Sequence, residues 1–89
     1  MINPVEVLTE VDCWAILRSH ELGRLAFHHG EGLQITPVNF AVAGEHVVFR
    51  TADGAKFSDL VQDPQVAFEV DSSTDEVAES VVCRGVVIE

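Results

Sequence analysis

A chain of 89 residues with 47% apolar and 22% charged residues has the composition of one small globular domain and not of a disordered segment. Such a chain buries only about 60 to 65% of its unfolded surface, so its core is small. Its 15 acidic and 5 basic residues give a formal net charge of -10, which would repel a phosphate backbone and excludes nucleic acid as an expected partner.

The sequence contains no membrane or metal signal. No apolar run reaches the roughly 20 residues that a spanning helix needs, and the first residues, MINPVEVLTE, lack the layout of a signal peptide. We therefore expect a cytoplasmic protein that binds no membrane and whose two thiols, Cys13 and Cys83, stay reduced. No cysteine or histidine has a partner at ligand spacing, so no metal site is predicted and the histidines are expected to be solvated in turns.

The first predicted element is a helix over residues 10–19. Thr9 can serve as its N-cap, with Asp12 three residues later in a short variant of the capping box. We expect Trp14 to be a core anchor and not a cofactor-stacking residue. The apolar stripe expected to face a sheet consists of Val11, Trp14 and either Ile16 or Leu17.

Strand-like alternation begins at Gly23. Residues 23–29 predict a first strand, residues 30–32 a turn, and residues 33–42 a second strand that Pro37 interrupts. Because proline cannot donate to a β-ladder, Pro37 predicts an edge, a bulge or a sharp bend.

After a tight turn at residues 43–45, further short elements follow. Because the acidic stretch lacks the ligand spacing of an EF-hand, we interpret it as a solvated loop and not as a calcium site. Short antiparallel strands with frequent turns favour a small barrel or sandwich over a parallel sheet. The predicted elements are a strand at 46–51, a short helix at 55–62, a strand at 65–70, the acidic loop at 71–79 and a last strand at 80–89.

The stretch VVFRTADGAKFSDL contains the strongest functional signal. Arg50 and Thr51 end the predicted third strand, and Lys56 lies in the first turn of the next helix. A hydroxyl, an ammonium group, unpaired backbone N–H groups and the positive end of a helix dipole would converge there on an anion such as phosphate. The glycine spacing of a nucleotide P-loop is absent. The alternative is a surface turn in which Lys56 pairs with Asp53 or Asp59.

Together with CWAILRSHELGRLAF upstream and PVNFAV between them, this stretch resembles the pyridoxamine 5'-phosphate oxidase-like family of FMN-binding split barrels, in particular its small bacterial members. The resemblance rests on the order and spacing of the motifs and covers residues 1–89 as a single domain. It implies a mainly β fold: an antiparallel split β-barrel with an N-terminal helix and a short helix between strands 3 and 4. Family members usually continue beyond the position of Glu89, so we expect the C-terminal part of the barrel to be missing.

The resemblance also implies a homodimer in which each flavin lies in a groove between two barrels. Carried over to this chain, Lys56 and Thr51 would contact the FMN phosphate, with Arg50 nearby. The flavin would supply the redox chemistry, so no catalytic acid or base is predicted.

The flavin ring would lie on the PVNF strand. The backbone around Val38 and Asn39 would face the isoalloxazine ring and its polar edge, and Pro37 would bend this strand so that its backbone groups address the ring. We therefore expect an FMN-binding protein that supports a flavin-dependent oxidoreductase activity on a small organic substrate. The alternatives are a deazaflavin-dependent reductase of the same superfamily and a truncated dimerisation module without catalysis.

Overall fold

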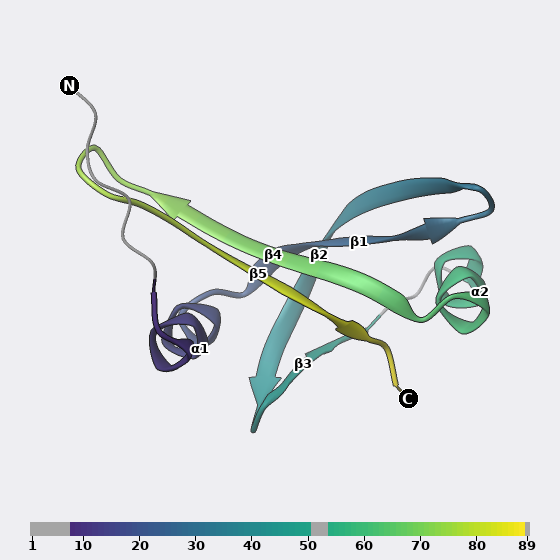
Figure 1. Ribbon diagram of the computed structural model, residues 1–89, viewed down its shortest axis with the longest axis horizontal. Coiled ribbons are helices and arrows are strands. Elements are labelled where there is room, and N and C mark those ends of the chain that lie inside the picture. Colours follow the sequence, from purple (N-terminus) through teal and green to yellow (C-terminus); the bar gives the residue numbers. More distant parts are fainter. Residues whose placement is uncertain (1–7, 51–53, 89) are drawn as a thin grey trace.

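The computed structural model of the protein describes residues 8–50 and 54–88 (Figure 1). The predicted sequence of a helix, three strands, a second helix and two further strands is confirmed. The elements are α1 (Glu10–Arg18), β1 (Leu22–His29), β2 (Gly32–Ala43), β3 (His46–Phe49), α2 (Gly54–Gln62), β4 (Gln65–Ser73) and β5 (Ala78–Val86).

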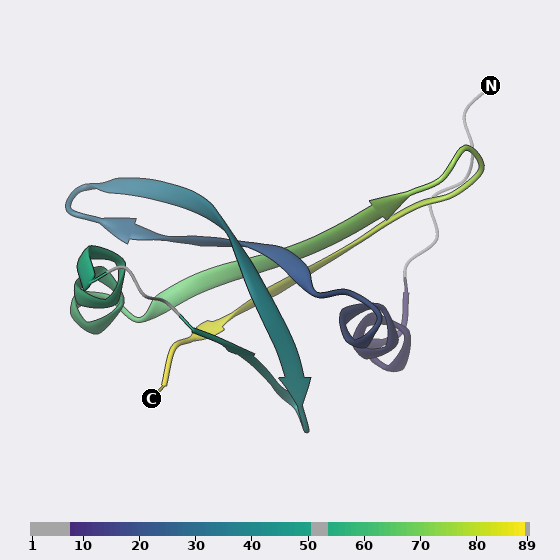
Figure 2. The ribbon, with the colours of Figure 1, turned by 180° about the vertical axis from the view of Figure 1, so that it is seen from behind.

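The strands form one antiparallel sheet of five strands in the order β3-β2-β1-β4-β5. The sheet curls into an open half-barrel, and the two helices lie near opposite ends of it (Figures 1 and 2). Its inner face and the two helices bury one cluster of apolar side chains, which consists of Ile16, Leu17, Leu25, Phe27, Val38, Phe40, Leu60, Phe68, Val70 and Val81. Within the described ranges, neither helix is long and apolar enough to cross a membrane.

Helix α1 begins as predicted, but it buries less of its surface than the spacing indicated. The Thr9 hydroxyl accepts a hydrogen bond from the Asp12 N–H at 3.2 Å and so caps the helix. Ile16 and Leu17 are buried, and Trp14 is partly buried against the core, as expected of an anchor. Val11 is 78% exposed, so its predicted place in the core was wrong. Only the C-terminal half of this short helix meets the sheet.

Strand β2 changes its partner along its length. Residues 32–39 pair with β1, and residues 40–43 pair with β3. The Phe40 N–H still points to the β1 side, where it donates to the Glu21 carbonyl at 2.9 Å. Because successive N–H groups of a strand point in opposite directions, the Pro37 nitrogen faces away from β1, toward an edge that no described strand covers. Pro37 therefore removes no ladder hydrogen bond, and the predicted edge is confirmed.

The acidic segment is mostly paired, so the prediction of a loop over residues 71–79 was wrong. Strand β4 extends to Ser73 and β5 begins at Ala78, and cross-strand pairs continue to the tip of the hairpin. Polar side chains are compatible with these strands because most residues of the protruding hairpin are exposed. Strand β5 ends the sheet, and its Val82 and Val86 side chains are 59% and 61% exposed.

Gly23 is required by close packing in the centre of the sheet. A Cβ atom at this position would lie 2.4 Å from Cζ of Phe68 and 3.0 Å from the Glu69 carbonyl oxygen. The Phe68 ring is only 4% exposed and packs edge-on against Phe40, with the two ring centroids 4.8 Å apart. The ring therefore has no free space into which it can move.

We expect Gly23→Ala to lower the free energy of unfolding by about 1 to 3 kcal/mol, as overpacking does in a closed core. Gly85→Ala is the matched control, because nothing lies within 4 Å of a Cβ there and the residue is also in a strand. That substitution should be neutral or stabilise the fold by up to about 1 kcal/mol. Urea unfolding of both variants measures the difference, and equal effects would contradict this account of Gly23.

Candidate functional site

The predicted anion-binding stretch starts where β3 ends. Arg50 directly follows Phe49 and has an exposed side chain. Helix α2 then begins at Gly54, so the chain passes from strand to helix over a few residues, as predicted. Thr51 lies outside the described residues. The backbone of Lys56 belongs to the first turn of α2, whereas its side chain lies outside the described part of the structure.

The residues predicted to face the flavin ring lie on β2, beside this strand end. Pro37 and Asn39 are exposed, whereas the Val38 side chain is 6% exposed and belongs to the core. Val38 can therefore offer a ligand only its backbone. Asn39 and Arg50 each lie next to the last pair of the β2–β3 ladder, Phe40 with Phe49. The register thus makes two of the predicted site residues neighbours across the two strands.

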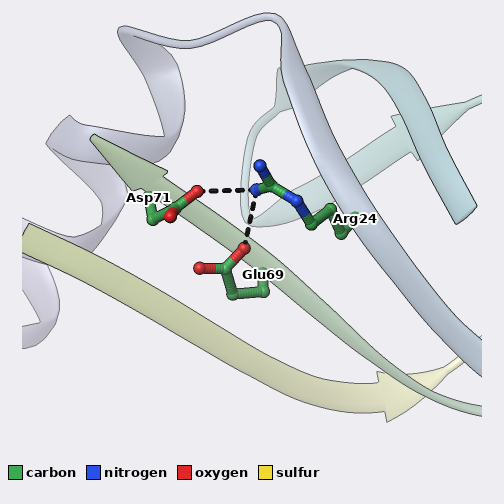
Figure 3. Close-up of polar contacts among 3 residues, drawn as sticks. All are labelled: Arg24, Glu69 and Asp71. Carbon is green, nitrogen blue, oxygen red and sulfur yellow. Dashed lines mark hydrogen bonds and ion pairs between the residues drawn. The ribbon is translucent and has the colours of Figure 1, made fainter. Parts of the chain in front are cut away.

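A charged cluster lies on the outer face next to Pro37, which is the register partner of Arg24 (Figure 3). The Arg24 guanidinium donates from Nη1 to Asp71 Oδ1 at 2.6 Å and to Glu69 Oε1 at 3.0 Å. The hydrogen bond and the charge of Asp71, followed by those of Glu69, raise the pKa of Arg24. Two carboxylates on one guanidinium leave a local negative charge, which disfavours a phosphate here and favours the opposite end of the site, at Arg50.

Two histidines at the end of β1 bind carboxylates on and just after α2. His29 Nδ1 lies 2.7 Å from Asp59 Oδ2, and the Asp59 side chain is only 14% exposed. His28 Nε2 lies 3.8 Å from Asp63 Oδ2, with both side chains far more exposed. The prediction that these histidines lie in turns was wrong, since both belong to β1, whereas their predicted exposure agrees with side chains that are 43% and 54% exposed. The sequence signal for these contacts was a pair of adjacent histidines at the end of a strand, followed later by two carboxylates four residues apart.

An open hollow of about 580 Å³ lies between the end of α1 and the second half of β2. Asn39 is one of the residues that line it, so the hollow adjoins the predicted ring site. Sequence analysis did not indicate the hollow, because its walls come from segments that only the fold brings together. The other lining residues are Arg18, His20, Glu21, Phe40, Ala41 and Val42.

The thiols and the acidic side chains form no metal site that the structure shows. Within residues 8–50 and 54–88, no group of three or more histidine, cysteine, aspartate and glutamate side chains can hold a metal ion. Cys13 and Cys83 are free thiols, and both pack partly buried against the core. Burial raises the pKa of the Cys83 thiol, and the nearby Cys13 adds to this effect.

Residues 9–89 match the family model of pyridoxamine 5'-phosphate oxidase. The chain belongs to the pyridoxamine 5'-phosphate oxidase-like family. The match confirms the resemblance that the GRLA, PVNF and VVFRT motifs indicated. No curated protein matches the chain in a sequence comparison.

Solved structures support the same assignment. The chain is similar to the FAD binding protein from Mycobacterium smegmatis, with 38% identity, a TM-score of 0.82 and coverage of 92% of this chain and 68% of that one. A conserved protein of unknown function from Corynebacterium diphtheriae has 38% identity and a TM-score of 0.78, over 94% of this chain and 66% of that one. An FAD-binding protein from Mesorhizobium loti has 25% identity and a TM-score of 0.81, over 89% and 58%.

These likenesses confirm the fold class. The five curled strands and two short helices of this family member correspond to part of a split barrel. The chain spans between 58% and 68% of the lengths of these three relatives.

The described residues fit a flavin nucleotide at both of its ends. A flavin nucleotide needs a cation for its phosphate and polar groups for the edge of its ring. Arg50 supplies an exposed cation at the end of β3, next to Asn39 on β2. The adjoining hollow brings a guanidinium, an imidazole, an amide and the Glu21 carboxylate to one place.

We expect the His29–Asp59 contact to hold α2 against the end of β1. A double-mutant cycle with His29→Gln and Asp59→Asn, measured by urea unfolding at pH 6, should give a coupling of about 0.5 to 1.5 kcal/mol for this half-exposed, charge-assisted contact. The cycle with His28→Gln and Asp63→Asn should give almost none, because that contact is longer and more exposed. A coupling near zero for the first pair would show that α2 docks without it.

Proposed function

We propose that the protein binds a flavin nucleotide, FMN or FAD, and supports a flavin-dependent oxidoreductase activity on a small organic substrate. The observation behind this proposal is the register that makes Asn39 and Arg50 neighbours, a few residues before the helix that contains Lys56. Family membership over residues 9–89 and two FAD-binding structural relatives support it. A bound flavin would supply the electron and hydride transfer, and the protein would bind and orient it.

The phosphate end of the ligand is proposed to lie between the end of β3 and the start of α2. Arg50 provides a permanent positive charge there, and the first turn of α2 provides N–H groups that have no partner within the helix, together with the positive end of the helix dipole. Thr51 and Lys56 are proposed as the hydroxyl and ammonium ligands. In a chain with a formal charge of -10, an anion needs such a local group of donors.

The ring end is proposed to lie along β2. Pro37 and Asn39 are exposed there, and the backbone edge of residues 33–39 has no strand partner within the described residues. The strand therefore offers N–H and C=O groups to a planar ligand while its core-facing side chains stay packed. A deazaflavin would use the same phosphate ligands, but the FAD-binding relatives favour a flavin nucleotide.

We also propose that the protein forms a homodimer through the outer face of its sheet. This face presents several large aliphatic side chains that are more than half exposed, beside the Arg24–Glu69–Asp71 cluster. Ladder pairing places Ile35, Ala26 and Ala67 in one row across three strands of this face. Exposed apolar groups at this density are typical of association surfaces. The aliphatic side chains are Leu33 and Ile35 on β2 and Val82 and Val86 on β5.

Lys56→Ala is expected to weaken FMN and FAD binding by about 1.5 to 3 kcal/mol, the contribution of a hydrogen bond to a charged group. Lys56→Arg is the matched control, because it keeps a positive charge at the same position and should change affinity little. Flavin fluorescence titration measures both variants. Equal affinities for wild type and Lys56→Ala would refute the proposed phosphate contact.

Val82→Lys is expected to convert the dimer to a monomer, because it places a charge on the proposed apolar interface. Val77→Lys is the matched control, since Val77 is equally exposed but lies at the tip of the β4–β5 hairpin. Sedimentation velocity of both variants gives the oligomeric state. A dimer that persists in Val82→Lys would place the interface elsewhere.

A further inference from the structure

The open hollow lies where β2 separates from β1. Chain direction changes after α1, and β2 leaves β1 beyond Asn39 to pair with β3 instead. The space between the end of α1 and this part of β2 is therefore not filled by another strand within the described residues. Its lining combines a guanidinium, an imidazole, a carboxylate and an amide with the backbone of residues 40–42.

One wall of the hollow is an unpaired strand edge. The Phe40 N–H points toward the α1–β1 connection, where it donates to the Glu21 carbonyl. Val42 is two residues further along the same strand, so its N–H points to the same side. On that side the described residues place no strand beside Val42. The Val42 N–H is therefore a hydrogen-bond donor on the side of the hollow, and the strand backbone fixes its direction.

His20 also lines the hollow, and the hydrogen bonds of its Nδ1 atom decide which ring nitrogen is left for a ligand. Its Nδ1 lies 2.8 Å from the Ile16 carbonyl oxygen, and the Ser19 hydroxyl lies 2.7 Å from that oxygen. Nδ1 also lies 3.0 Å from the Ser19 hydroxyl oxygen, and when that hydroxyl donates to the Ile16 carbonyl, Nδ1 bears the proton and donates to the carbonyl or to the hydroxyl. In the neutral ring Nε2 is then a hydrogen-bond acceptor. Nδ1 is turned back to α1, so Nε2 is the nitrogen that remains for a ligand in the hollow.

Arg18 completes the site at the rim. Its Nη2 donates to the Gly44 carbonyl at 3.2 Å, and its guanidinium carbon lies 5.7 Å from the centre of the Trp14 ring. These two contacts fix the side chain, and a guanidinium has five N–H donors in all. The hollow therefore offers donors from Arg18 and Val42 and acceptors from His20 and the Glu21 carboxylate.

We propose that this hollow is the subsite for the imide edge of the flavin ring, with His20 as the residue that recognises the ring N3–H. The imide presents one N–H and two carbonyl oxygens, so it needs one acceptor and two donors, and residues of both kinds line the hollow. Asn39 belongs both to the hollow and to the predicted ring site, so the two are continuous. The inference rests on the proposed flavin function and adds His20, Arg18 and Val42 to its site.

The test compares FMN with its N3-methyl derivative, which lacks the imide proton. The wild-type protein should bind FMN about tenfold more tightly than the methylated ligand in a fluorescence or calorimetric titration. His20→Asn keeps a donor at the position of Nδ1 but removes Nε2, so it should weaken FMN binding to the level of the methylated ligand. His20→Gln places an amide oxygen near the position of Nε2 and should restore part of the preference.

His46→Asn is the matched control, because His46 is exposed on β3 and does not line the hollow. It should leave both affinities unchanged. If the wild type binds FMN and the methylated ligand equally, or if His20→Asn behaves like the wild type, the subsite is refuted while the flavin proposal stands. If the wild type binds neither FMN nor FAD, the proposed function itself fails, and the subsite with it. The comparison of ligands on the wild type remains decisive even where a variant does not fold.

Discussion

The exchange of partners along β2 is the constraint on which the rest of the structure depends. A strand of 12 residues pairs on one edge with β1 and then on its other edge with β3, so each half keeps one free edge. Pro37 lies in the first half with its nitrogen on the free side, where a missing N–H removes no ladder bond. Because side chains alternate, Val38 and Phe40 stay in the core while Asn39 remains exposed. Both ends of the proposed ligand site follow from this exchange.

Charge distribution separates the two ends of that site. Of the basic residues, Arg24 is bound to two carboxylates and Arg18 is fixed between a carbonyl and an aromatic ring. Neither is therefore available as a phosphate ligand without losing contacts that the fold already makes. Arg50 lies at the strand end that leads into α2, and the sole lysine of the chain, Lys56, follows in that helix. An anion would thus be attracted to one end of an otherwise acidic surface.

The order of the elements could be predicted from the sequence because alternation, turn residues and caps are local signals. Contacts between distant segments could not, since His29 meets Asp59 only after α2 docks on β1. Helical spacing assigns Val11 to a face but does not reveal how much of that face the sheet covers. Polar composition concealed the strand pairing within residues 71–79. Asn39 and Arg50 were predicted from family motifs, whereas the hollow beside His20 exists only because β2 departs from β1.

The two proposed ends of the ligand site are also built on different packing contacts. The ring end is built on β2 and on α1, whose Ile16 and Leu17 side chains are part of the buried core. The phosphate end includes the start of α2, which is held to the sheet by Leu60 and by exposed histidine–carboxylate contacts. A ligand that spans both would link α2 to β2 and α1, so its binding free energy would add to the stability of a small core. Salt would weaken the phosphate end and leave the imide contacts largely unaffected, because only the former depends on exposed charges.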